Sequence, residues 1–135
     1  MIALDTYTLV RYLVRDEAEQ AEAARSLLES LTAERPGFVC REVIVELAWV
    51  LERAYGYSRD RIATVLEQLV ATEHLVIEAA DDVARAAFRY RPGSAGFSDL
   101  MILAAAERSG ARPLYTFDQT VAQLEGVALI QGSTS

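Results

Sequence analysis

Met1-Ile-Ala-Leu4, a short apolar run that leads directly into Asp5, indicates a buried strand followed by a helix. Pro113-Leu-Tyr-Thr-Phe117 leads into Asp118 in the same way, so each of these acids closes a strand and opens a helix. Asp99 stands just before another apolar run, at the start of a further predicted helix. In an open parallel sheet the carboxyl ends of the strands share one edge, where ligands bind. The sequence therefore predicts that these three acids are neighbours in space.

Strand-like and helical segments alternate along the rest of the chain. We expect strands over residues 1–5, 75–77, 113–117 and 127–130, and a short strand or a turn over residues 38–40. Helices are expected over residues 6–14, 17–31, 41–55, 59–70, 81–90, 98–108 and 119–124. This alternation predicts a layered α/β domain with a largely parallel sheet. The length favours a single domain over residues 1–131, with a frayed tail over residues 132–135.

Glu46 is the acid that the helix pattern explains least. It lies inside the segment 43–51, which is apolar almost all round and therefore predicts a buried helix. The residues one helical turn away offer no positive partner. A buried unpaired carboxylate is costly, so Glu46 must find a cation, become protonated or reach a cleft. Two explanations stay open: an arginine from elsewhere in the chain, or a metal ion shared with the three aspartates.

Each aspartate also has a purely structural explanation, because aspartate is a preferred N-cap of helices. Capping accounts for Asp5, Asp99 and Asp118 one at a time, but it does not account for Glu46. A divalent cation would explain all four carboxylates together. An all-oxygen site selects Mg²⁺ or Mn²⁺, and zinc is disfavoured because the chain has one cysteine and one histidine. Both of these residues have a structural interpretation.

The composition excludes several classes of protein. All 13 basic residues are arginine, and without lysine the chain cannot form a P-loop. A net charge of −7 argues against passive wrapping of nucleic acid by a basic surface, although it does not exclude a metal-dependent nuclease. The single cysteine, the absence of a basic signal segment and the absence of a long apolar run favour a cytoplasmic protein that does not associate with membranes.

Four blocks of sequence, in this order, resemble the PIN-domain ribonucleases, and within them the VapC-type toxins of bacterial toxin–antitoxin systems. The resemblance covers nearly the whole chain and implies a PIN-like three-layer α/β/α sandwich with a largely parallel central sheet. The blocks are Ile2-Ala-Leu-Asp-Thr6 with Leu9-Val-Arg-Tyr-Leu13, Val43-Ile-Val-Glu-Leu-Ala-Trp-Val-Leu51 with Tyr55-Gly-Tyr57, Gly96-Phe-Ser-Asp-Leu-Met-Ile102 with Ala104-Ala-Ala-Glu-Arg-Ser-Gly110, and Tyr115-Thr-Phe-Asp118 with Leu124-Glu-Gly-Val127.

The resemblance implies metal-dependent endonucleolytic cleavage of RNA, a homodimer, and a small antitoxin protein that covers the acidic cleft. Mg²⁺, or Mn²⁺ in its place, would be the cofactor, with no organic cofactor. The catalytic and metal-binding residues would be Asp5, Glu46, Asp99 and Asp118. The hydroxyls of three residues could hydrogen-bond to these acids, or cap helices instead: Thr6, Ser98 and Thr116. Four arginines flank the acidic blocks: Arg11, Arg15, Arg89 and Arg91. They would either contact RNA phosphates or simply be solvated at the surface.

Two departures from the family pattern keep rival functions open. Tyr7 follows Thr6 where the family often has asparagine or serine, and Gly96 stands where many relatives carry a further acid. These changes favour a catalytically inactive, PIN-like interaction module. A metal-dependent phosphatase acting on small molecules is a further alternative. The absence of lysine, and of an Asp-x-Asp motif at residues 5–7, argues against the common α/β phosphatases.

Overall fold

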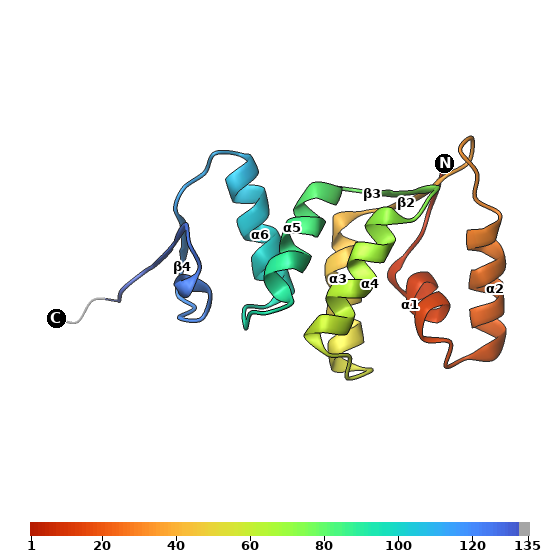
Figure 1. The fold of residues 1–135 in the computed structure, drawn as a ribbon, viewed down its shortest axis with the longest axis horizontal. Helices are drawn as coiled ribbons and strands as arrows, with labels where there is room; N and C mark the ends of the chain where they lie inside the picture. The colour runs from red at the N-terminus through yellow and green to blue at the C-terminus, as the bar shows by residue number, and fades with distance from the viewer. Residues whose placement is uncertain (133–135) are drawn as a thin grey trace.

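The computed structural model describes residues 1–132, within which the chain forms helices and parallel strands in alternation (Figure 1). The remaining residues of the predicted tail lie outside the described part. The strands are β1 (Ile2–Ala3), β2 (Gly37–Val39), β3 (Leu75–Ile77), β4 (Leu114–Thr116) and β5 (Val127–Leu129). The helices are α1 (Thr6–Val14), α2 (Ala18–Glu29), α3 (Arg41–Arg53), α4 (Arg59–Ala71), α5 (Ala80–Tyr90), α6 (Phe97–Arg108) and the 3-10 helix η1 (Val121–Gln123).

The strands form two parallel sheets. β1, β2 and β3 pair in that order, and β4 pairs with β5. The β4–β5 sheet lies towards one end of an elongated molecule, and α5 and α6 stand between it and the first sheet (Figure 1). The predicted α/β class with parallel strands is confirmed, while the strands expected in one central sheet are divided between two.

The apolar stripes of the helices build the core. Side chains with almost no exposed surface come from α1, α3, α4, α5 and α6, and they form one cluster against the first sheet. Burying a leucine or isoleucine side chain contributes roughly 1.5–3 kcal/mol, so this cluster is the main stabilising feature. Its largest fully buried members are Tyr90, Leu9, Ile44, Leu47, Leu51, Ile62, Leu66, Leu100 and Met101.

Helix α3 is less buried than its sequence predicts. Glu42, Glu46 and Trp49 are exposed, with 60% of the Trp49 surface accessible. One face of α3 packs into the core through Ile44 and Leu47, and the opposite face is open. The prediction of a helix buried all round is therefore wrong, and Glu46 meets solvent rather than the core.

Arg59, at the start of α4, fixes the loop that leads into α6. Its Nε donates a hydrogen bond to the carbonyl oxygen of Tyr90 at 2.8 Å, and its Nη2 donates to the carbonyl of Ala95 at 2.6 Å. The guanidinium also stacks 3.8 Å from the centre of the Tyr90 ring. Both ends of the loop 91–96 are thereby held on α4, and α6 begins from a defined point.

Candidate functional site

Asp5 lies at the end of β1, where it caps α1. Its Oδ1 accepts hydrogen bonds from the Thr8 backbone N–H at 3.0 Å and from the Thr8 hydroxyl at 2.8 Å. The bond from the Thr8 N–H, followed by the bond from its hydroxyl, lowers the pKa of the Asp5 carboxyl. Asp5 is therefore held ionised, and the capping role expected for it is confirmed.

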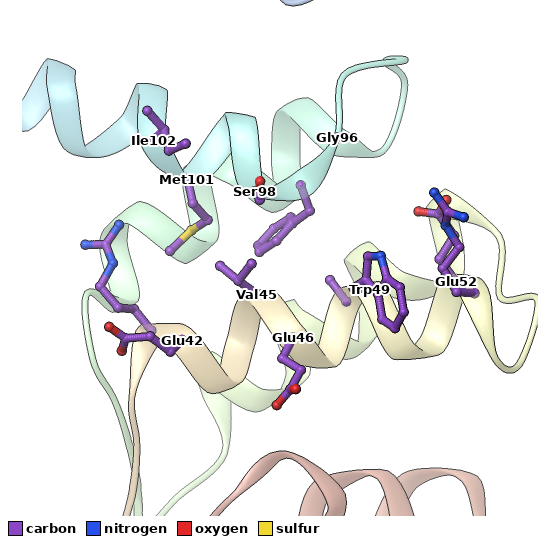
Figure 2. Close-up of a pocket in the computed structure, with 13 residues that line it drawn as sticks. Glu42, Val45, Glu46, Trp49, Glu52, Gly96, Ser98, Met101 and Ile102 are labelled. Carbon is purple, nitrogen blue, oxygen red and sulfur yellow. The ribbon is translucent and has the colours of Figure 1, made fainter.

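Glu46 points from α3 towards α1, where Thr6 contacts it. The Thr6 side chain is 3% exposed and donates a hydrogen bond from its hydroxyl to Glu46 Oε1. Figure 2 shows Glu46 on the side of α3 that faces away from α6. Across residues 1–132, no arginine forms an ion pair with Glu46, so the structure does not support the arginine explanation for this acid. Thr6 follows Asp5 directly, and the Asp5 and Glu46 carboxylates thus belong to one region of the molecule.

The bond between Thr6 and Glu46 can be measured by a double-mutant cycle. Thr6→Val keeps the shape of the side chain and removes its hydroxyl, and Glu46→Ala removes the acceptor. We expect a coupling of about 1 kcal/mol between the two changes in the free energy of unfolding, because the bond is charge-assisted but partly solvated. Urea denaturation of the wild type, both single variants and the double variant gives this value. Strict additivity would contradict the contact.

Asp99 and Asp118 form the second acidic region. Asp118 Oδ1 accepts from the backbone N–H groups of Thr120 and Val121, at 2.8 and 3.1 Å, at the start of η1. Its own N–H donates to the Thr116 hydroxyl at 3.0 Å. Burial raises the pKa of the Asp99 carboxyl, and the negative charge of Asp118 raises this pKa further. These two acids are therefore close enough to repel one another.

Asp99 does not cap its helix. The N-cap of α6 is Gly96, which makes no side-chain hydrogen bond, and Asp99 sits within the first turn. A Cβ added at Gly96 would lie 3.4 Å from Asp99 Oδ2, so Gly96 adjoins the Asp99 carboxyl. Of the predicted caps, Asp5 and Asp118 act as such, and the capping interpretation of Asp99 is wrong.

The four acids predicted to converge thus lie as two pairs in the described chain. Asp5 and Glu46 adjoin α1, and Asp99 and Asp118 adjoin the start of α6. Over residues 1–132, no group of three or more histidine, cysteine or acidic side chains is placed to hold a metal ion. The donors are all carboxylate oxygens, which suit Mg²⁺ or Mn²⁺. The chemistry of the donor set fits such an ion, while a single chain presents that set in two halves.

An apolar groove of about 680 Å³ runs between α3 and α6. Figure 2 shows Val45 and Trp49 on its α3 side, and Met101 and Ile102 on its α6 side. Ser98, predicted to support the acids, lines the same groove. Sequence reasoning missed this groove, although the apolar character of α6 on every side was a signal that it packs against more than one surface.

Three of the four arginines proposed to contact RNA have acidic partners within the chain. Arg11 contacts Asp16 at 3.6 Å, and Arg89 contacts Glu107 at 2.8 Å. Arg91 pairs with both Asp60 and Glu67. Arg15 ends α1 and donates to the carbonyl of Tyr12 at 3.4 Å.

Parallel strands that are followed by carboxylates, flanked by helices that carry further acids, define an α/β protein with acidic side chains beyond the ends of its strands. The chain matches the PIN domain over residues 2–127, and it belongs to the PIN domain family. It is 28% identical over 125 residues to a VapC ribonuclease of Aquifex aeolicus (strain VF5), covering 92% of each chain. The family resemblance noted in the sequence is confirmed.

The solved structure of Mycobacterium tuberculosis VapC20, a toxin that cleaves the sarcin–ricin loop, is also similar. It matches with a TM-score of 0.46 at 19% sequence identity, over 94% of this chain and 97% of that one. Within the part of this chain that the structure describes, each helix is too short or too polar to cross a membrane.

Proposed function

We propose that this protein is a Mg²⁺-dependent endoribonuclease and the toxin of a toxin–antitoxin pair. The observation that carries the proposal is the position of its four acids within a PIN domain: one at the end of β1, one on α3, one in the first turn of α6 and one after β4. The similarity to a VapC ribonuclease over nearly the whole chain supports the same activity. RNA phosphodiesters are accordingly the proposed substrate.

The proposed chemistry requires neutralisation of an anionic phosphodiester and an oriented water. A divalent cation held by the four carboxylates would supply Lewis acidity and a more acidic water. The chain contributes the orientation of those carboxylates. Thr8 holds Asp5, Thr6 holds Glu46, and the backbone N–H groups of η1 hold Asp118. Each oxygen that is fixed before RNA arrives reduces the entropy lost on reaching the transition state.

The α3–α6 groove suits the proposed antitoxin. Its walls are apolar, and acidic and basic side chains stand at its rim. An amphipathic helix could lay its apolar face into such a groove. The same groove would place a bound antitoxin beside α3, which carries Glu46.

The proposal is tested by incubating purified protein with a mixed RNA substrate in Mg²⁺, Mn²⁺ or EDTA. We expect cleavage with either metal and none in EDTA. An Asp118→Asn variant purified in parallel controls for contaminating nucleases. Equal cleavage by that variant would assign the activity to a contaminant. The absence of cleavage by the wild type on transfer, ribosomal and messenger RNA would favour the interaction module that Tyr7 and Gly96 suggest.

Metal binding should also be visible without RNA. At a hundredfold excess of Mg²⁺ over its dissociation constant, we expect the free energy of unfolding to rise by about 2.7 kcal/mol. The gain should be smaller in Asp118→Asn, because this variant loses a ligand. Thermal melting with and without millimolar Mg²⁺ measures the effect, and NaCl at equal ionic strength controls for general charge screening. Identical melting curves for wild-type protein with and without Mg²⁺ would contradict the metal site.

A further inference from the structure

The second sheet is too small to stand alone. β4 and β5 are two parallel strands, and isolated two-stranded sheets are marginal, while parallel sheets are normally covered on both faces. Here two aromatic side chains are open to solvent: Tyr115, in the middle of β4, is 64% exposed, and Phe117, just after β4, is 72% exposed. The C-terminal unit, defined as residues 114–130, therefore presents an apolar surface and an unpaired strand edge.

The first sheet has a matching edge at β1. The N–H of Ile2 donates to the carbonyl of Pro36, just before β2, and the N–H of Leu4 donates to the carbonyl of Phe38 in β2, each at 2.9 Å. The backbone N–H and carbonyl of Ala3, between them, therefore point away from β2. In the second sheet, the N–H of Leu114 and the carbonyl of Thr116 bond to the β5 side, so the backbone groups of Tyr115 point away from β5. The free edges of β1 and β4 thus each offer one donor and one acceptor.

The hydrogen-bond pattern restricts how these two edges can pair. In a parallel pair of strands, consider a residue whose N–H and carbonyl face the partner strand. These groups bond to the residues just before and just after the one directly opposite, and not to the opposite residue itself. Ala3 must then lie opposite Leu114 or Thr116, but not opposite Tyr115. With Ala3 opposite Thr116, Tyr115 lies beside Ile2 and Phe117 beside Leu4, which is a buried core residue. This register buries both exposed aromatic rings against the apolar face of β1.

The same register aligns the acids. Asp5 follows Ala3 by two positions, and Asp118 follows Thr116 by two, so the two carboxylates lie opposite one another at the carboxyl ends of their strands. Asp99 lies near Asp118, whose charge acts on it, and Glu46 lies near Asp5 because it is bonded by Thr6, the next residue. One strand pairing therefore joins the two acidic pairs that a single chain keeps apart.

Within one chain, α5 and α6 prevent this pairing. They lie between the two sheets (Figure 1), and α6 is anchored in the core through Leu100 and Met101. Residues 109–113 connect α6 to β4 and span at most about 17 Å when extended. Two packed helices, each about 10 Å across, separate the edges. The β1 edge must therefore be met by a C-terminal unit from elsewhere.

We propose that two copies of this chain exchange their C-terminal units, so that β4 of one copy pairs in parallel with β1 of the other. The exchange is reciprocal and closes as a two-fold dimer. Each dimer then contains two sheets in the order β3-β2-β1-β4-β5, with the last two strands from the partner copy. Each acidic site is composed of Asp5 and Glu46 from one chain and Asp99 and Asp118 from the other. The strand pairing stands by itself, and the composite catalytic site rests on the proposed ribonuclease function.

Disulfide trapping in the full chain tests the pairing without any activity. In a Cys40→Ser background, Ala3→Cys and Thr116→Cys place thiols on opposite residues of neighbouring strands, within the separation that a disulfide spans. We expect oxidation at low micromolar concentration to give a covalent dimer. The matched control, Ala3→Cys with Tyr115→Cys, directs the two side chains to opposite faces and should not crosslink.

Each outcome of the trapping decides the proposal. A disulfide within one chain, seen as monomeric mass with loss of both thiols, would overturn the exchange and show closure inside a single copy. Absence of any disulfide in variants that melt like the Cys40→Ser parent would overturn the pairing itself. Light scattering of the wild type provides a measurement independent of mutation: we expect a dimer, and a monomer at the same concentration as the trapping would overturn the exchange.

Mixing two inactive variants tests the composite site. Asp5→Asn and Asp118→Asn should each lack cleavage. When they are unfolded and refolded together, about half of the dimers are mixed and each mixed dimer has one intact site, so about a quarter of the wild-type rate should return. An inactive mixture beside an active wild type would overturn the composite site. An inactive wild type would instead count against the ribonuclease, and the trapping result would still decide the exchange.

Discussion

RNA cleavage should fall by a factor of about 100 or more when Asp99 is replaced by asparagine, because a preorganised charge at the reacting centre is typically worth that much. Asparagine keeps the size of the side chain and removes the negative charge. The measurement is the cleavage rate in Mg²⁺ at neutral pH. Glu73→Gln is the matched control, since Glu73 precedes β3 and therefore lies at the opposite edge of the sheet from the acids. A rate within tenfold of the wild type would remove Asp99 from the site.

The same variant should be at least as stable as the wild type in metal-free buffer. Burial and the charge of Asp118 raise the pKa of Asp99 in the folded state. A raised carboxyl pKa contributes stability that is complete below the unfolded pKa and is lost as the pH rises through the folded pKa. At neutral pH the wild type has lost that contribution, because the Asp99 carboxyl is ionised in a partly buried position next to Asp118. Asparagine is uncharged at every pH, so the variant avoids this loss of stability. A strongly destabilised Asp99→Asn variant would indicate a structural role instead.

Tyr90→Ala should lower the free energy of unfolding by about 3–5 kcal/mol, which is the usual cost of truncating a fully buried aromatic residue. Tyr90 has no exposed surface, its ring lies edge-on to Phe97 with centroids 5.8 Å apart, and Arg59 stacks on it. Its hydroxyl donates to Glu52 at 3.0 Å. Burial, followed by the bond to Glu52, raises the pKa of Tyr90 to about 12, so it remains a donor throughout the physiological range.

Two variants separate the contributions to this effect. Tyr90→Phe keeps the ring and loses the bond to Glu52, for which we expect about 1 kcal/mol. Phe88→Ala removes a ring that is 76% exposed and should change stability by less than about 0.5 kcal/mol. Urea denaturation at pH 7 compares all three. A Tyr90→Ala variant within 1 kcal/mol of the wild type would contradict the packing described for this residue.

Local features of the fold were largely predictable, because they depend on residues that are close in sequence. The strand predicted over residues 75–77 has those bounds in the structure, and the helices predicted over residues 81–90 and 98–108 begin within one residue of α5 and α6. The Asp5 cap also follows from its immediate neighbours. Glu46 shows the limit of this reasoning. Apolar neighbours in sequence suggested a buried acid, but the exposed side of α3 is set by which other helices pack against it, and no local pattern encodes that packing.

The arrangement of strands was not predictable in the same way. The sequence indicates that β1 and β4 are strands followed by acids, but it does not indicate which strand each one pairs with. In the structure β1 pairs with β2 and β4 pairs with β5, in two separate sheets. Apolar runs of this length fit an edge strand and a central strand equally well. The four candidate acids could therefore be named from the sequence, whereas their separation into two pairs required the structure.

The ties from Arg59 to both ends of the loop 91–96 have a thermodynamic consequence for the acid that follows. A loop that is free in the unbound protein must be immobilised by its ligand, and that loss of conformational entropy weakens the affinity. Here the immobilisation occurs during folding, since the guanidinium holds the carbonyls of Tyr90 and Ala95 whether or not a ligand is present. Asp99, in the first turn of α6, is therefore already oriented, and a ligand bound there would lose no affinity to the ordering of this loop.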